Sequence, residues 1–261
     1  MAENNNVVGF VPDIAYLKVI FTQKKVPMKN VFLYFLFLLI ACNHKEGHAT
    51  RQKGASAALP ASSKEGLPLP DDTSYTTYTT FKQAVQADKN KLKENTPDSI
   101  SNYLYTRLNK DIYAYWKGTP WDFNGTSRQP GVGTIACGYF VTNTLSDLGF
   151  NIQRIKLAQV VSSEMIKTLC VGIRRFAQFD QLRTYLAQQP DNSVYIIGLD
   201  FHTGYILKDA SGSYFMHANY IGRVGVVKER IEDAKALRDN KSFMIGSLTA
   251  NTARLQQWVR E

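Results

Sequence analysis

The chain has 261 residues, of which 44% are apolar, 12% aromatic and 20% charged, so it can bury a core and is neither wholly disordered nor fibrous. No uncharged apolar run is long enough for a membrane-spanning helix, which excludes a multi-spanning membrane protein. The net charge of +9 favours contact with an anionic surface. Because no phosphate-binding glycine loop and no zinc-finger spacing accompany that charge, we expect no nucleic-acid partner.

The N-terminal part of the chain reads as a targeting segment. Lys29 precedes an uncharged apolar run, residues 31–41, which ends directly before Cys42. A run of this length after a basic residue is typical of a signal peptide and is too short to cross a bilayer. We predict that residues 1–41 hold an upstream extension and a signal peptide, with translation starting at Met28 or at Met1.

The end of this run, Leu39 to Cys42, resembles the lipobox of bacterial lipoproteins. The resemblance implies cleavage before Cys42 and a lipid on its thiol, so that the protein is anchored to a membrane of the cell envelope, facing the periplasm or at the outer membrane. The alternative is a buried apolar helix that ends in a cysteine.

Residues 42–73 are rich in Ser, Ala, Gly, Pro and Lys and lack periodic apolar residues, so we predict a flexible linker there. His44 and His48 lie four residues apart in it, but the many helix breakers argue against a fixed metal site. We expect no metal and no cofactor. The rest of the chain, residues 74–261, is predicted to form one domain.

The first part of this domain predicts helices. Thr96 and Pro97 form a helix start, and the apolar residues that follow recur every four positions up to Gly118, namely Ile100, Leu104, Leu108, Ile112 and Trp116. After a loop at 121–134 rich in glycine and proline, a second helix begins near Cys137 and ends at Gly149. Shorter helices are predicted at 163–169 and 179–188.

After Pro190 the pattern changes to short β-rich runs separated by turn residues. We predict strands at 194–199, 201–207, 214–218, 223–227 and 243–248, and a C-terminal helix at 251–260 that covers one end of the core. Helices followed by strands with hairpin-length connections indicate an α+β fold, in which N-terminal helices pack on an antiparallel sheet.

Cys137 is the candidate nucleophile because it follows the glycine-rich loop and opens a helix. Unpaired N–H groups and the helix dipole at that position are expected to lower its pKa and favour the thiolate. Cys170 lies between Leu169 and Val171, which predicts an ordinary core cysteine. A disulfide between Cys137 and Cys170 is the alternative for an exported domain.

Two histidines, His202 and His217, are the candidate partners of the thiol. A cysteine nucleophile needs an imidazole to exchange protons with, and that imidazole needs a polar partner that fixes its tautomer. Strand alternation puts His202 on one face with Gly204 and Ile206, and the turn near Ser211 brings His217 beside it on the next strand. Each histidine alone is also compatible with a hydrogen-bonded structural role.

These segments resemble the NlpC-type cell-wall cysteine peptidases and amidases. Gly118-Thr119-Pro120-Trp121 is similar to the family's Gly-Thr-Pro-Tyr segment, and Ala136-Cys137-Gly138 to its Asp-Cys-Ser segment. His202-Thr203-Gly204 and Phe215-Met216-His217 are similar to its two histidine strands, so the likeness runs in order over about residues 115–220.

The resemblance implies a papain-like fold and a thiol hydrolase that cleaves an amide bond in peptidoglycan stem peptides. It assigns Cys137 as nucleophile, His202 as base and His217 as the residue that orients the base. Trp121 takes the place of a tyrosine that supports the oxyanion site, which implies a substrate-binding role. Asn219 and Asp200 remain alternatives to His217.

Two other functions stay open at this point. The same thioester chemistry would serve an acyl or amide transferase, in which an amine rather than water resolves the intermediate. A non-catalytic envelope-binding lipoprotein with the same fold would be favoured by a disulfide at Cys137.

Overall fold

The computed structural model describes residues 77–261, so the predicted signal peptide, the predicted lipidation site Cys42 and the predicted linker at 42–73 lie outside the described residues. Within residues 77–261 no helix is long and apolar enough to span a membrane. The helices are α1 (Tyr78–Leu92), α2 (Pro97–Thr106), α3 (Tyr113–Trp116), α4 (Cys137–Asp147), α5 (Arg154–Gln159), α6 (Ser162–Leu169), α7 (Phe179–Ala187), α8 (Lys235–Arg238) and α9 (Thr252–Arg260).

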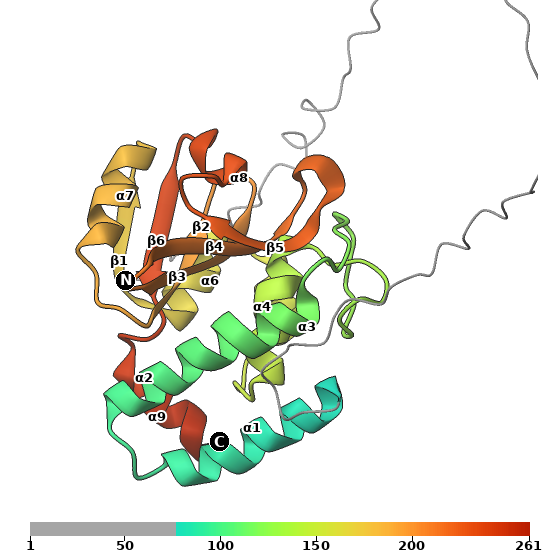
Figure 1. The fold of residues 1–261 in the computed structure, drawn as a ribbon, viewed down its shortest axis with the longest axis vertical. Helices are drawn as coiled ribbons and strands as arrows, with labels where there is room; N and C mark the ends of the chain where they lie inside the picture. The colour runs from blue at the N-terminus through green and yellow to red at the C-terminus, as the bar shows by residue number, and fades with distance from the viewer. Residues whose placement is uncertain (1–76) are drawn as a thin grey trace, which may run out of the picture. The chain divides into compact units, whose positions relative to one another are not determined.

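One antiparallel sheet organises the domain (Figure 1). Its strands are β1 (Val171–Phe176), β2 (Ser193–Gly198), β3 (Thr203–Asp209), β4 (Gly212–Asn219), β5 (Gly225–Arg230) and β6 (Phe243–Ser247), in the spatial order β1-β6-β2-β3-β4-β5. The α+β class and the antiparallel sheet predicted from the sequence are confirmed.

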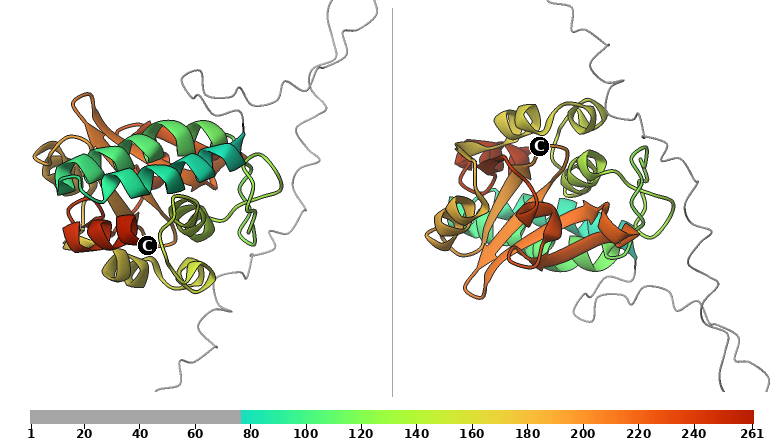
Figure 2. Two further views of the ribbon diagram at one scale, coloured as in Figure 1. Left: turned by 90° about the horizontal axis from the view of Figure 1, so that it is seen from below. Right: turned by 90° about the horizontal axis from the view of Figure 1, so that it is seen from above.

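Both faces of the sheet are covered. One apolar cluster joins one face to α1, α2, α4, α6 and α9, and a second cluster joins the other face to α7 and α8. Figures 1 and 2 show α1 and α2 running side by side in the first of these layers. The order of elements in the sequence predicted that helices pack on the sheet, but not that α7 and α8 cover its second face. Strands separate these two helices from the other helices in the chain.

The predicted helix over 97–116 is a continuous helical segment with a π-helical stretch, Arg107–Ile112, between α2 and α3. An α-helix has 3.6 residues per turn, so side chains spaced strictly every four residues drift around its surface. The wider π turn counteracts that drift. It keeps all five apolar residues of the repeat buried: Ile100, Leu104, Leu108, Ile112 and Trp116.

The β3–β4 hairpin fixes the register on which the candidate histidines depend. Its strands pair from Asp209 with Gly212 to Tyr205 with Met216, across a two-residue turn. The next pair outward is Gly204 with His217, and a Cβ atom on Gly204 would lie 2.8 Å from the Cβ of His217. Glycine at position 204 therefore leaves room for the His217 side chain on the neighbouring strand.

Four of these elements were not predicted, namely β1, α1, α5 and α8. Strand β1 is an edge strand with an irregular register and a left-handed Gly172 (φ 61°), so it shows no alternation of apolar residues. Helix α1 has only a sparse apolar stripe, because buried Lys89 occupies one of its core positions and donates to the Gly149 carbonyl at 2.9 Å. Helix α5 is a short helix with one buried residue, Leu157.

The C-terminal helix α9 depends on Trp258, which is fully buried, stacks on Phe150 at 4.8 Å and donates its Nε1–H to the Leu148 carbonyl at 2.8 Å. We expect Trp258→Ala to lower the free energy of unfolding by about 3–5 kcal/mol, because it leaves a cavity and an unpaired carbonyl. Urea unfolding measures this loss. The exposed neighbour Gln256, changed to Ala, should stay within about 0.5 kcal/mol of the parent protein, and equal losses in the two variants would contradict the role of Trp258.

Candidate functional site

Cys137 is the first residue of α4. The first hydrogen bond of that helix runs from the Phe140 N–H to the Ala136 carbonyl, so the N–H groups of Cys137 and Gly138 have no partner within the helix. A Cβ atom on Gly138 would collide with the carbonyl oxygen of Ala158 in α5. Glycine at this position therefore lets α5 pack against the start of α4, beside the cysteine.

The loop before Cys137 is fastened to α4. The Asn143 side chain donates to the Ser127 carbonyl at 2.6 Å, and Arg128 pairs with the buried Asp147 at 3.2 Å. Asp147 also accepts a hydrogen bond from the Tyr78 hydroxyl at 2.8 Å. These contacts hold the chain that leads into the nucleophile position.

Burial raises the pKa of the Cys137 thiol. The N–H groups of Thr203, Gly138 and Cys137 itself lower it again, but by less than burial raises it. The prediction that the helix start lowers this pKa is therefore wrong. The backbone N–H groups do act in that direction, but the burial of the sulfur has the larger effect. Cys137 is a neutral thiol at rest and needs a base to ionise it.

His202 and His217 lie side by side, as strand alternation predicted. His202 Nε2 is 2.7 Å from His217 Nδ1, and His217 Nε2 is 3.0 Å from the Glu229 carboxylate. The three side chains form one hydrogen-bonded chain that runs from the β2–β3 turn through β4 to β5. His217 is fully buried and His202 nearly so.

The carboxylate fixes the tautomers along this chain. An ionised carboxylate only accepts, so His217 must donate from Nε2 and keeps a lone pair on Nδ1. His202 then donates from Nε2, and its Nδ1 carries the lone pair of a base. Among the described residues, His202 Nδ1 has no hydrogen-bond partner, so it is available to a substrate or a thiol.

Both histidines are neutral near pH 7. Burial lowers the pKa of His202 far below its ordinary value, and the neighbouring His217 lowers it further. Burial also lowers the pKa of His217, and Glu229 partly counteracts this. A neutral His202 can accept a proton, whereas an imidazolium could not.

Cys137 and His202 line the same cavity, with a volume of about 240 Å³. Its walls come from the start of α4, the connection between α5 and α6, and the turn between β2 and β3. The thiol and the base, which are far apart in the sequence, therefore face one space where a substrate could bind.

The alternative orienting residues are engaged elsewhere. The Asp200 carboxylate accepts from the Lys241 N–H at 3.3 Å and from the Ser242 hydroxyl. Asn219 accepts from the Ile221 N–H at 2.8 Å. Of the three residues considered for orienting His202, only His217 forms a hydrogen bond with it in the described part of the chain.

Trp121 does not line the cavity. Its ring packs against Tyr220 at 5.9 Å, and Tyr220 packs against His202 at 5.1 Å, so Trp121 lies behind Tyr220. Its Nε1–H is buried and has no hydrogen-bond partner among the described residues. A substrate-binding role for Trp121 would act through Tyr220 rather than by direct contact in this arrangement.

Glu229 is the site residue that the sequence patterns did not reveal. The predicted strand stopped at Val227, whereas β5 continues to Arg230. Val227 pairs with His217, and Glu229 lies two residues further on the same face of the sheet. Extending the alternation of Val227 by one repeat would have pointed to this carboxylate.

Cys170 is a buried core cysteine, and burial raises its pKa to about 12. Both described cysteines are free thiols, so the alternative disulfide between Cys137 and Cys170 is not formed.

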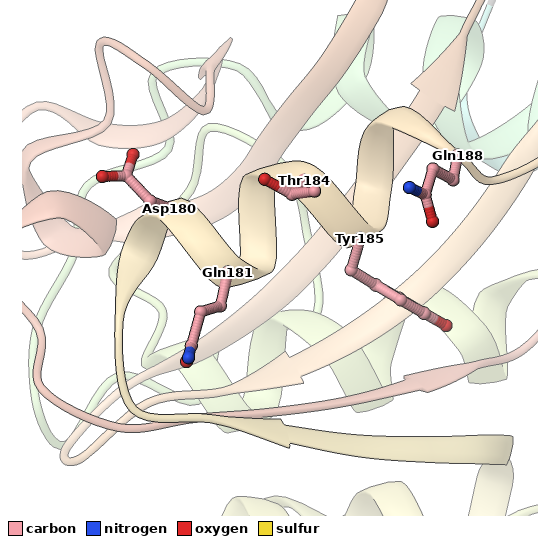
Figure 3. A pocket seen from close by; sticks show the side chains of 5 residues that line it. All are labelled: Asp180, Gln181, Thr184, Tyr185 and Gln188. Atoms are coloured by element: carbon pink, nitrogen blue, oxygen red, sulfur yellow. The ribbon is translucent and has the colours of Figure 1, made fainter.

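Two further observations concern the described residues outside this cavity. A hollow along α7 is lined by Asp180, Gln181, Thr184, Tyr185 and Gln188, all from that helix and the residue after it, and it holds neither cysteine nor histidine (Figure 3). Residues 77–261 contain no cluster of three or more His, Cys, Asp or Glu side chains that could hold a metal ion.

No protein-family model matches the chain, and neither curated proteins nor solved structures give a match to it. The resemblance to NlpC-type enzymes therefore rests on the motifs of the sequence.

The two thiols should differ in reactivity. We expect iodoacetamide to modify Cys137 well before Cys170 in the folded protein, because Cys137 is only partly buried and Cys170 has the strongly raised pKa. The rate at Cys137 should still rise with pH above neutrality, since its pKa is not lowered. Peptide mass mapping after timed alkylation measures both rates. Faster modification of Cys170 would contradict the greater access to Cys137, and a Cys137 rate already at its plateau at pH 6 would contradict a neutral thiol.

The buried histidine pair should also make stability depend on pH. Unfolding restores an ordinary histidine pKa of about 6.5, so below that pH the unfolded chain binds more protons than the folded one. We expect the free energy of unfolding to fall as the pH drops from 6.5 towards 5. The double variant His202→Gln, His217→Gln should show a shallower decline over this range in urea titrations, whereas an unchanged slope would contradict the neutral pair.

Proposed function

We propose that the protein is a thiol hydrolase that cleaves an amide bond through an acyl-enzyme. The observation that carries this proposal is that Cys137 and His202 line one cavity while His217 and Glu229 form a hydrogen-bonded chain behind His202. A thiol, a neutral imidazole with a free lone pair and a partly buried carboxylate that fixes the imidazole are the parts that nucleophilic catalysis by cysteine needs.

The reaction begins when His202 takes the thiol proton and the sulfur attacks the carbonyl carbon of the amide. The backbone N–H groups at the start of α4 stabilise the oxyanion that forms. His202 then returns the proton to the leaving nitrogen as the C–N bond breaks, which leaves a thioester on Cys137. Water, with its proton taken by His202, attacks the thioester and releases the carboxylic acid and the free thiol.

His217 and Glu229 act as positioning residues. Each proton that His202 accepts creates an imidazolium, which the hydrogen bond to His217 and the negative charge of Glu229 stabilise through the chain. Glu229 also keeps both rings in the tautomers that leave Nδ1 of His202 free to accept.

We take the substrate class from the sequence motifs, which resemble those of NlpC-type cell-wall enzymes with a papain-like fold. On this proposal the substrate is the peptide stem of peptidoglycan, and the lipid on Cys42 holds the enzyme at the membrane of the cell envelope. The free thiol of Cys137 favours this enzyme over the non-catalytic binding lipoprotein, for which a disulfide at that cysteine would have been the support.

Digestion of purified peptidoglycan, followed by mass analysis of the products, tests this function. We expect Cys137→Ser and His202→Ala to lose turnover by roughly a hundredfold or more. His217→Gln and Glu229→Gln, which keep a hydrogen-bond acceptor, should retain more activity than His217→Ala and Glu229→Ala.

Asp233→Asn is the matched control for Glu229→Gln, because it removes an exposed carboxylate beyond the end of β5 and should not change the rate. Products that carry an added amine instead of water would identify the transferase. Full hydrolysis by folded Cys137→Ser would contradict the proposal.

A further inference from the structure

The cavity that Cys137 and His202 line is largely apolar. Six of its lining residues are apolar, and they come from α5, the α5–α6 connection, α6 and the β2–β3 turn: Ala158, Val160, Val161, Met165, Leu199 and Phe201. Apolar lining with a few polar groups at one end is the usual make-up of a site that buries an apolar part of its ligand.

Two of these residues remain exposed to solvent at the mouth of the cavity. Phe201 is 88% exposed and Val161 is 67% exposed, the first and third highest values among the exposed large apolar side chains of residues 77–261. Exposed apolar side chains are common singly, but here two of them flank the cavity that contains the candidate nucleophile and base.

The turn that carries Phe201 is held in place. The Leu199 N–H donates to the His202 carbonyl at 2.8 Å, and the Asp200 N–H donates to the Asn240 side chain at 3.1 Å. The Asp200 carboxylate accepts from the Lys241 N–H and the Ser242 hydroxyl. These bonds hold the turn on both sides of Phe201, whose side chain is exposed to solvent.

The charge of the lining residues also favours some substrate groups over others. Although the chain carries a net charge of +9, no lysine or arginine lines this cavity, and Asp200 is its one carboxylate among the described residues. His202 is neutral because burial lowers its pKa. A negatively charged substrate group would therefore meet a carboxylate and no cation at this wall.

We propose that the wall formed by Val161, Met165 and Phe201 is a binding subsite for an uncharged apolar group attached to the scissile carbonyl. This inference rests on the proposed thiol hydrolase and names the substrate group that its cavity accepts. Within a peptide stem it favours an alanyl residue over an acidic or basic one, and outside peptides it favours an amide with an aliphatic acyl chain.

A series of fluorogenic amides of 7-amino-4-methylcoumarin tests the subsite with the full protein. The acyl groups are acetyl, butyryl, pentanoyl, hexanoyl and octanoyl, and glutaryl serves as the charged counterpart of pentanoyl because a carboxylate replaces its terminal methyl group. We expect kcat/KM to rise about fourfold for each methylene that enters the subsite, until the cavity is filled. Pentanoyl should exceed glutaryl by more than tenfold.

Two variants at the mouth of the cavity locate the effect. Phe201→Ser and Val161→Asp should each lower the ratio of kcat/KM for hexanoyl over acetyl by about tenfold. Val161 is the N-cap residue of α6 and offers that helix no side-chain hydrogen bond, so aspartate there is expected to support the fold. The controls are Phe123→Ser and Val224→Asp, which change exposed apolar residues that do not line the cavity.

The outcomes separate this inference from the proposed function. A dependence on chain length that weakens in the two mouth variants and not in the controls supports the subsite. Peptidoglycan hydrolysis that depends on Cys137, together with no chain-length dependence, no turnover of the amides or equal rates for pentanoyl and glutaryl, overturns the subsite alone. Absence of any hydrolysis that depends on Cys137 overturns the proposed function itself.

Discussion

The register of the β3–β4 hairpin is the constraint on which the candidate site depends. Side chains alternate between the faces of a strand, so a slip of one residue would move His217 to the opposite face and break its bonds to both His202 and Glu229. The two-residue turn between Asp209 and Gly212 sets this register, and Gly204 leaves room for the Cβ of His217 on the facing strand. The adjoining strand β5 then supplies Glu229 on the same face. A two-residue turn and one glycine thus determine how the side chains of His202, His217 and Glu229 are arranged.

Burial sets the resting state of the site as much as hydrogen bonding does. It raises the pKa of Cys137 and lowers the pKa of His202, and both changes favour the uncharged forms of the pair. The protein therefore holds a thiol and a neutral base at rest, in place of a thiolate and an imidazolium. The same enclosure places the apolar residues around Phe201 next to the thiol, so the acid–base properties and the expected substrate preference have one physical origin.

Local sequence patterns predicted the elements that carry strong signals. The helix start at Cys137, its end at the left-handed Gly149 (φ 85°) and the C-terminal helix follow from capping residues and apolar spacing. The strand that contains Glu229 was predicted too short, because its second half is a run of three charged residues, Lys228 to Arg230, with no apolar signal. Strand β1 was missed because it is exposed and irregular, and its pairing with β6 joins residues about seventy positions apart. A pairing between residues so far apart in the chain produces no pattern in a short stretch of sequence.

The sequence by itself determined which candidate catalytic residues the chain carries and in what order. A cysteine at a helix start comes first, and two histidines follow, which strand alternation across one short turn makes neighbours. These are local relations, since helix caps and hairpin registers depend on residues close together. Only the tertiary structure decided that Cys137 is buried enough for its pKa to rise, that Glu229 completes the histidine chain, and that six apolar residues and no lysine or arginine line the cavity. Each of these features depends on segments that come from distant parts of the chain and pack together. Burial depends on all the neighbours of a residue in space, so the spacing of residues in the sequence does not reveal it.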